Sequence, residues 1–144
     1  MSTENKAIAR RFLEGFNSDN LAGANEFIAA NFTNHDPSTP PLPTGPEGYK
    51  QLVSTYRTIY PDLRMAVVDD LIAEGDKVVG RWTAQGTNTG ELMGMPPTGK
   101  QATITGISIF TLAGGQVTEQ WVNWDTLGML QQLGVVPTPG QGGA

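Results

Sequence analysis

The sequence predicts an α+β domain in which helices cover one face of a curved antiparallel sheet. Apolar residues recur at helical spacing as far as Tyr60, and from Leu63 onward they alternate with polar residues as in strands. The chain has 144 residues, which is the size of one domain with one core. Helices followed by long strands are typical of an α+β architecture.

Two helices are expected at the start of the chain. The first covers residues 3–17, where one apolar stripe contains Ile8, Phe12 and Phe16. The second begins near Asp19, a residue type that caps helices, and ends near Asn31. The residues that this second helix would bury are Leu21, Ala24, Phe27 and Ile28.

A proline-rich segment separates these helices from a third. Residues 34–45 contain four prolines, so they cannot continue a helix and are predicted to form a loop or a lid. The third helix begins at Pro46 and ends before Pro61. Its apolar residues recur at helical spacing and are Tyr49, Leu52, Val53, Tyr56, Ile59 and Tyr60.

Two hairpins are expected to form the sheet. The first turns at Gly75-Asp76 and joins residues 63–74 to residues 77–89. The second joins residues 101–113 to residues 116–125 through two glycines, which allow the positive φ angles of a tight turn. The segment between the two hairpins is predicted to be a loop.

A short C-terminal helix completes the predicted domain. It begins at Asp125-Thr126, runs to Leu133 and stops at Gly134. The sequence therefore predicts one domain over residues 1–134. Residues 135–144 are rich in proline and glycine, and we expect them to form a flexible tail or a strap on a partner subunit.

The register of the second hairpin predicts the wall of a cavity. With a simple two-residue turn, Gly106 pairs with Asn123 and Ser108 pairs with Trp121. One face of the sheet then carries large polar or aromatic side chains opposite small ones, which leaves space for a ligand. The larger residues on this face are Glu119, Trp121, Asn123 and Asp125. A β-bulge would reverse the assignment of the two faces.

Asp125 is the leading candidate for an acid–base residue. A carboxylate at the end of a strand and beneath a layer of helices can be partly shielded from water and can transfer protons. The alternative is that Asp125 caps the last helix, and one residue can do both.

Other side chains are weaker candidates. His35 is the only histidine, and it either acts at the mouth of the cavity or makes structural hydrogen bonds. Trp82, Trp121 and Trp124 have flat surfaces that suit an aromatic ligand, although core packing explains them equally well. Tyr56 offers a phenol, and Met93 lies in the loop before the second hairpin; both residue types more often fill the core.

The composition excludes several classes of function. The chain has no cysteine and one histidine, so thiolate chemistry and the usual zinc sites are excluded, and neither a metal nor a cofactor is expected. No Gly-x-Ser-x-Gly motif and no glycine-rich nucleotide motif is present.

The net charge is −5 and the basic residues are scattered, which argues against nucleic acid as a partner. No apolar run suits a membrane span or a signal peptide, so we expect a cytoplasmic protein.

Several short segments between Ile8 and Gly134, taken in order, resemble the SnoaL-like polyketide cyclase family. They are residues 34–37 (Asn-His-Asp-Pro), 45–48 (Gly-Pro-Glu-Gly), 60–64 (Tyr-Pro-Asp-Leu-Arg), 73–76 (Ala-Glu-Gly-Asp), 86–87 (Gly-Thr), 97–100 (Pro-Thr-Gly-Lys), 121–125 (Trp-Val-Asn-Trp-Asp) and 132–134 (Gln-Leu-Gly). Each segment is weak evidence alone, and their ordered sum is fairly specific.

The resemblance implies a cone-shaped fold, shared with nuclear transport factor two, around a deep pocket. It also implies ring closure of an aromatic polyketide ester by cofactor-free intramolecular aldol condensation, with Asp125 as the acid–base residue and His35 as a cavity residue that polarises a substrate oxygen. Asn88 stands where the family often has histidine, so a neutral group replaces a titratable one. The residues then expected to bind substrate are Asn123, Trp121, Trp82, Asn88, Tyr56 and Met93.

Two other functions stay open at this point. The first is epoxide hydrolysis, for which this fold uses an Asp–Arg–Asp set that activates water. A similar set could form here from Arg81, Asp125 and either Asp69 or Asp70. A cross-strand pair of Asp70 and Arg81 is the simpler interpretation. A non-catalytic module that holds a hydrophobic ligand is the other possibility.

A homodimer or homotetramer is also expected, because the outer sheet face would carry a partly apolar strip. The strip is made of Thr103, Thr105, Ile107, Ile109, Val122 and Trp124.

Overall fold

Helix α1 (Ser2–Glu14) opens the computed structural model, which describes residues 2–137. Its apolar stripe buries Phe12 and Leu13, and a turn of 3-10 helix, η1 (Gly15–Asn17), extends the stripe to Phe16. Helix α3 (Pro46–Ile59) has proline in its first turn and ends before Pro61. The helical spacing of the sequence is therefore confirmed for both segments.

The second predicted helix is much shorter than expected. Helix α2 covers only Ala24–Phe27, and the chain then becomes strand β1 (Ile28–His35). This strand runs parallel to β6 (Gln116–Trp124), the last strand of the sheet. Pairing with the exposed edge of β6 overrides the local helical spacing, because a free sheet edge leaves its backbone groups without partners. The prediction of a helix as far as Asn31 is wrong, and the sheet is mixed rather than purely antiparallel.

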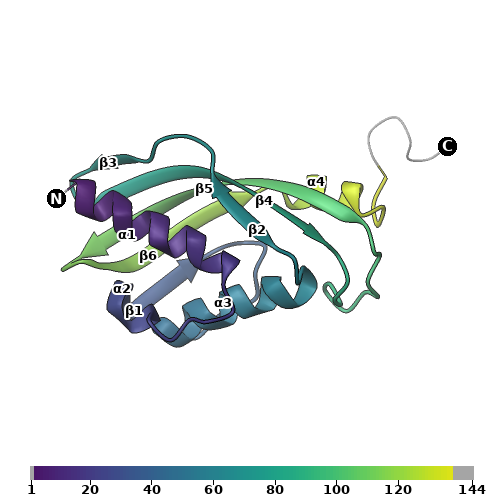
Figure 1. Ribbon diagram of the computed structural model, residues 1–144, viewed down its shortest axis with the longest axis horizontal. Coiled ribbons are helices and arrows are strands. Elements are labelled where there is room, and N and C mark those ends of the chain that lie inside the picture. The colour runs from purple at the N-terminus through teal and green to yellow at the C-terminus, as the bar shows by residue number, and fades with distance from the viewer. Residues whose placement is uncertain (1, 138–144) are drawn as a thin grey trace.

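The remaining strands form an antiparallel meander. The order across the sheet is β1-β6-β5-β4-β2, and β3 also pairs with β4. The strands are β2 (Arg64–Val67), β3 (Ile72–Glu74), β4 (Lys77–Thr87) and β5 (Gln101–Ala113). The first predicted hairpin is thus confirmed at its turn, but its first strand is interrupted between β2 and β3. Figure 1 shows the curved sheet with α1 crossing in front of it and α3 running along its lower side.

A β-bulge near the start of β6 decides which side chains face the helices. Thr111 pairs with Glu119, whereas the next residue, Leu112, pairs with Val117. One extra residue, Thr118, is therefore accommodated in β6, and the register differs by one from that of a simple hairpin. The predicted register is wrong beyond this point, and the two faces of β6 are reversed.

The C-terminal helix agrees with the prediction. Helix α4 (Thr126–Gln132) packs on β5, where the side chain of Gln132 hydrogen-bonds the backbone N–H and C=O of Thr103 at 2.7 and 2.8 Å. Gly134 has a φ of +80° and ends the helix. Most of the predicted tail, residues 138–144, lies outside the described residues. Among the helices of residues 2–137, none is long and apolar enough to cross a membrane.

One end of the space between helices and sheet is filled by aromatic side chains. The ring of Phe12 lies 5.6 Å from that of Phe32, 4.7 Å from that of Tyr49 and 5.0 Å from that of Phe110. The Tyr49 hydroxyl donates a hydrogen bond to the backbone oxygen of Phe12 at 2.7 Å. This end is a close-packed core, and the space near the other end of α3 is left for a cavity.

Candidate functional site

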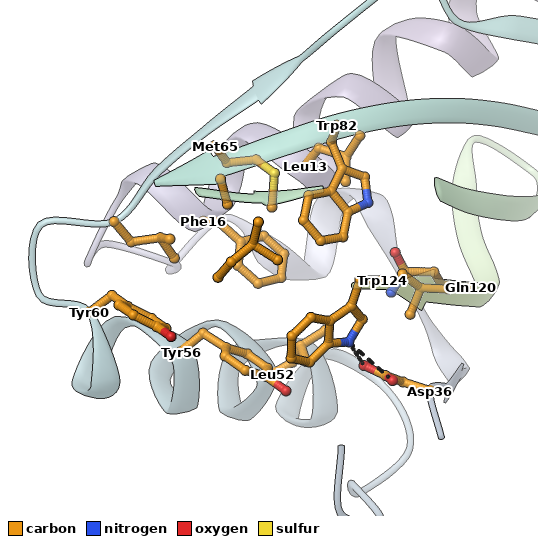
Figure 2. A pocket seen from close by; sticks show the side chains of 14 residues that line it. Leu13, Phe16, Asp36, Leu52, Tyr56, Tyr60, Met65, Trp82, Gln120 and Trp124 are labelled. Atoms are coloured by element: carbon orange, nitrogen blue, oxygen red, sulfur yellow. Dashed lines mark hydrogen bonds between the residues drawn. The ribbon is translucent and has the colours of Figure 1, made fainter. Parts of the chain in front are cut away.

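An apolar cavity lies between the C-terminal half of α3 and the sheet. A water-sized sphere can reach about 60 Å³ within it, and the empty space between its wall atoms, with the open mouth included, is about 560 Å³. The side chains that line it are drawn in Figure 2 and are Leu13, Phe16, Asp36, Leu52, Tyr56, Tyr60, Leu63, Met65, Trp82, Ala84, Ile104, Gln120, Val122 and Trp124. Mostly apolar walls with a few polar groups are typical of a site for a small hydrophobic ligand.

Two tryptophans form one wall of the cavity. Trp82, Gly106 and Trp124 are in register across β4, β5 and β6. A Cβ atom on Gly106 would collide with the indole ring of Trp82, so glycine at this position allows the ring to lie close against β5. The sequence predicts space for a ligand next to the small residue Gly106, but the Trp82 ring occupies that space. The cavity lies beside this ring.

Asp36 is the carboxylate of the cavity. The indole N–H of Trp124 donates to its Oδ2 at 3.0 Å, and the Thr39 hydroxyl donates to the same oxygen at 2.6 Å. The backbone N–H of Ser38 donates to Oδ1 at 2.8 Å, which forms an Asx turn with the residues after β1. Figure 2 shows the carboxylate held against Trp124 at one end of the cavity. Three donors thus fix a half-buried carboxylate beside apolar walls.

Tyr56 extends this hydrogen-bonded group. Its hydroxyl lies 2.7 Å from the Thr39 hydroxyl oxygen, and the hydrogen of Thr39 is directed to Asp36. The Tyr56 hydroxyl is therefore the donor to Thr39. Burial raises the pKa of Tyr56 to about 12, with a further contribution from the charge of Asp36, against a lowering by the Thr39 hydrogen bond. Tyr56 stays protonated at neutral pH, so the order of donation is Tyr56 to Thr39 to Asp36.

A second polar chain crosses the sheet behind the cavity. The Trp82 indole N–H donates to the Ser108 hydroxyl at 3.0 Å, and this hydroxyl donates to Oε1 of Gln120 at 2.8 Å. The amide nitrogen of Gln120 then donates to Oδ1 of Asn34 at 2.6 Å. Each of these groups is satisfied within the protein, as buried polar groups usually are. This wall therefore presents mainly apolar surface to a ligand.

Two of the predicted site residues, Trp82 and Tyr56, line the cavity. Their role in binding substrate stays a prediction. Asp125 does not line the cavity: it is exposed, and its Oδ1 accepts a hydrogen bond at 2.8 Å from the backbone N–H of Gly128 at the start of α4. The capping alternative describes these contacts, and the predicted position of Asp125 inside the cavity is wrong.

His35, Trp121 and Asn123 lie on the opposite side of the sheet, around a shallow open depression. The rings of His35 and Trp121 stack with centroids 4.7 Å apart, and Nε2 of His35 lies 3.0 Å from a carboxylate oxygen of Glu119. The prediction that these residues face the cavity is wrong. The bulge in β6 turns Gln120, Val122 and Trp124 inward in place of Trp121 and Asn123, and on β1 it is Asn34, bonded to Gln120, that faces inward in place of His35.

Asn88 and Met93 serve the loop between β4 and β5 rather than the cavity. Asn88 is fully buried, and its Oδ1 accepts hydrogen bonds from the backbone N–H and the hydroxyl of Thr98, both at 2.9 Å. Its amide nitrogen donates to the backbone oxygen of Gly90 at 2.7 Å, so Asn88 holds both ends of the loop. Met93 is 59% exposed with a φ of +51°. Neither residue lines the cavity where substrate binding was expected.

The residues proposed for epoxide hydrolysis do not meet in the cavity. Arg81 forms an ion pair with Asp69 rather than with Asp70, and both partners are exposed. Within residues 2–137, no three His, Cys, Asp or Glu side chains gather as a possible metal site.

Asp36 and Gln120 are cavity residues that the sequence does not identify as site residues. Trp124 is expected from the sequence to offer a flat surface to a ligand, but it is also expected on the outer face. Asp36 belongs to the Asp36-Pro37-Ser38 sequence, which is typical of an Asx turn that fixes a carboxylate. Trp124 and Gln120 have no such signal, since their orientation depends on the bulge.

The fold agrees with that of the proteins that this chain resembles. The sequence model described as SnoaL-like polyketide cyclase matches residues 6–133. TsrD from Streptomyces laurentii is 25% identical with a TM-score of 0.83 over 94% of this chain and 98% of its own. A proposed polyketide cyclase from Acidithiobacillus ferrooxidans is 32% identical with a TM-score of 0.80, and the match covers 94% of this chain and 97% of that protein. IdmH, a proposed polyketide cyclase from Streptomyces antibioticus, is 31% identical with a TM-score of 0.76, and the match covers 90% of this chain and 98% of IdmH. No curated protein matches the sequence.

Proposed function

Because the chain belongs to the SnoaL-like polyketide cyclase family, we propose that it closes a ring of an aromatic polyketide ester by intramolecular aldol condensation. The observation that supports this proposal is a fixed carboxylate, Asp36, at the wall of an apolar cavity. Trp82 and Trp124 provide flat surfaces for a planar substrate. The proposed site therefore combines a proton acceptor with a shape that suits fused rings.

Asp36 is the proposed acid–base residue. Its carboxylate takes a proton from the carbon beside the ester carbonyl, and the resulting carbanion attacks a carbonyl carbon in the same molecule. Asp36 then returns the proton to the oxygen that was attacked. Three donors hold the carboxylate, and the Trp124 N–H is shared between Oδ2 at 3.0 Å and Oδ1 at 3.3 Å, so the longer contact at Oδ1 is the one that a substrate proton would replace. An extended aromatic polyketide delocalises much of the enolate charge itself.

A matched pair of substitutions tests this proposal. Asp36→Asn keeps the shape of the side chain but removes its basicity, and we expect turnover of a polyketide methyl ester to fall by about 10²–10⁴-fold. Asp125→Asn is the control, because Asp125 contacts only the start of α4 and turnover should stay within about twofold of the parent protein.

The opposite result would support the original interpretation of the sequence. If Asp125→Asn loses turnover while Asp36→Asn keeps it, then Asp125 reaches the substrate and the proposed role of Asp36 is wrong. The thermal unfolding of both variants, followed by circular dichroism, shows whether each is folded at the assay temperature.

A non-catalytic module that binds a hydrophobic ligand is the second candidate function. It is favoured by the inner wall, where Trp82, Ser108 and Gln120 already satisfy one another. Tight binding of a polyketide without turnover, unchanged by Asp36→Asn, would support this function over catalysis.

We also propose that two copies pair through the outer face of the sheet. Val79, Ile109, Trp121 and His35 form one row across β4, β5, β6 and β1. Ile107 beside this row is 49% exposed and Ile109 is 39% exposed, which is an apolar strip of the kind that partners cover. Val122 and Trp124, which the sequence placed in this strip, face the cavity instead. Light scattering should give the mass of a dimer or tetramer, and a monomer would contradict the proposal.

A further inference from the structure

The hydroxyl group of Tyr60 is buried without a hydrogen-bond partner. The residue is 1% exposed and lines the cavity, and no group within residues 2–137 accepts from or donates to its hydroxyl oxygen. Buried hydroxyl groups are normally paired, because leaving one unpaired lowers stability. Phenylalanine would fill the same space without this cost, so the hydroxyl calls for an explanation.

The other hydrogen-bonding groups around the cavity are already engaged. The Tyr56 hydroxyl is bonded to Thr39, the Trp124 N–H to Asp36 and the Trp82 N–H to Ser108. Among the described cavity residues, Tyr60 is therefore the one whose buried hydroxyl has no hydrogen-bond partner at all. Figure 2 shows Tyr60 at the end of the cavity opposite Asp36, with its ring pointing inward along α3.

The backbone around Tyr60 holds the ring in place. The N–H of Tyr60 donates to the backbone oxygen of Tyr56, and its own oxygen accepts from the N–H of Leu63, both at 2.9 Å. On the sheet side, a Cβ atom added to Gly86 would lie 2.6 Å from the Cβ of Tyr60, so the two residues are in close contact. A hydroxyl fixed in this way needs little further ordering when a ligand binds.

Tyr60 is a hydrogen-bond donor at neutral pH. Burial raises its pKa to about 12, and the neighbouring Tyr56 acts in the same direction. The phenol therefore keeps its proton, and it can donate to a carbonyl oxygen or share a hydrogen bond with a phenol of a ligand.

We propose that Tyr60 is a specificity-determining residue that binds an oxygen atom on the substrate's ring system, at the end of the cavity opposite Asp36. The inference rests on the proposed function, since it places the reacting carbon at Asp36. The substrate class is then a fused aromatic polyketide that carries a hydroxyl or carbonyl oxygen on the ring remote from the closing one. Hydrogen bonding at both ends fixes which carbon lies beside the carboxylate.

Two probes of similar size and shape test the inference without turnover. The probes are 2-naphthol and 2-methylnaphthalene, and binding is followed by quenching of the fluorescence of Trp82 and Trp124. We expect the parent protein to bind 2-naphthol about 2–12-fold more tightly, the range for one net hydrogen bond. Tyr60→Phe should lose this preference, bind 2-methylnaphthalene at least as well, and unfold at the same or a higher temperature.

Asp36→Asn separates this inference from the proposed function. If the preference for 2-naphthol persists in Tyr60→Phe and disappears in Asp36→Asn, the naphthol hydroxyl binds at Asp36 and the inference is overturned. Equal binding of the two probes by the parent protein, or binding of neither, also overturns it. Loss of the proposed catalytic role would appear instead as unchanged turnover of Asp36→Asn, with the preference for 2-naphthol still dependent on Tyr60.

Discussion

Strand β6 presents one tryptophan to each side of the sheet, and the two have different surroundings. Trp124 faces the cavity, where it donates to Asp36 and meets the ring of Tyr56 edge-on at 5.8 Å. Trp121 faces away, is 38% exposed and stacks on His35. Which tryptophan faces inward depends on one extra residue at the bulge. The local sequence is the same in either register, so a single backbone irregularity selects the cavity wall.

The two aspartates differ in the same way. Asp36 follows β1 and reaches the cavity, whereas Asp125 follows β6 and caps α4. Both stand at the end of a strand in the same region of the sheet, but only Asp36 is directed toward the apolar space. A carboxylate near a cavity is therefore not enough to identify a catalytic residue, because its direction depends on the register of the strand before it.

The largest difference in stability is expected between the two tryptophans. Removing a buried tryptophan side chain costs about 3–5 kcal/mol, and for the half-buried Trp124 we expect Trp124→Ala to lower the free energy of unfolding by about 2–4 kcal/mol. Trp121→Ala on the outer face should cost less than about 1 kcal/mol. Urea denaturation measures both at protein concentrations low enough for paired copies to separate, and a larger loss for Trp121→Ala under these conditions would contradict the observed register.

A smaller effect is expected at Gly106, opposite Trp124. Gly106→Ala places a methyl group against the Trp82 indole, and overpacking of this kind should lower the free energy of unfolding by about 1–3 kcal/mol. In a Trp82→Phe background the smaller ring leaves room, so the same substitution should cost less. The double-mutant cycle measures this coupling, and additive costs would show that Trp82 does not lie against β5.

Helices α1, α3 and α4 and the hairpin turns could be predicted from the sequence because their signals are local. The spacing of Phe12 and Phe16, the proline at the start of α3 and the glycine after α4 each act within a few residues of the structure they predict. Strand β1 could not be predicted in this way, since residues 24–28 fit a helix and only pairing with β6 makes residues 28–35 a strand.

The candidate site depended on information that the sequence does not carry locally. Nothing in the residues near Thr118 marks an extra residue in the strand, so the faces of β6 were assigned in reverse. Trp82 and Tyr56 line the cavity because their positions depend on β4 and α3, which have no bulge before them, and their role in binding substrate stays a prediction. The sequence does not single out Asp36, because residues 34–45 predict a loop and residues 34–37 contribute to the family resemblance without marking this carboxylate.

The central claim is that ligands bind on the inner face of β6, beside Trp124 and Asp36. The most direct test is to record the indole N–H signals of the three tryptophans by ¹⁵N-resolved NMR while 2-naphthol is added, with each signal assigned from a Trp→Phe variant. We expect the signals of Trp82 and Trp124 to shift with added ligand while that of Trp121 stays in place. A shift of Trp121 with no change at Trp124 would contradict this account of the site.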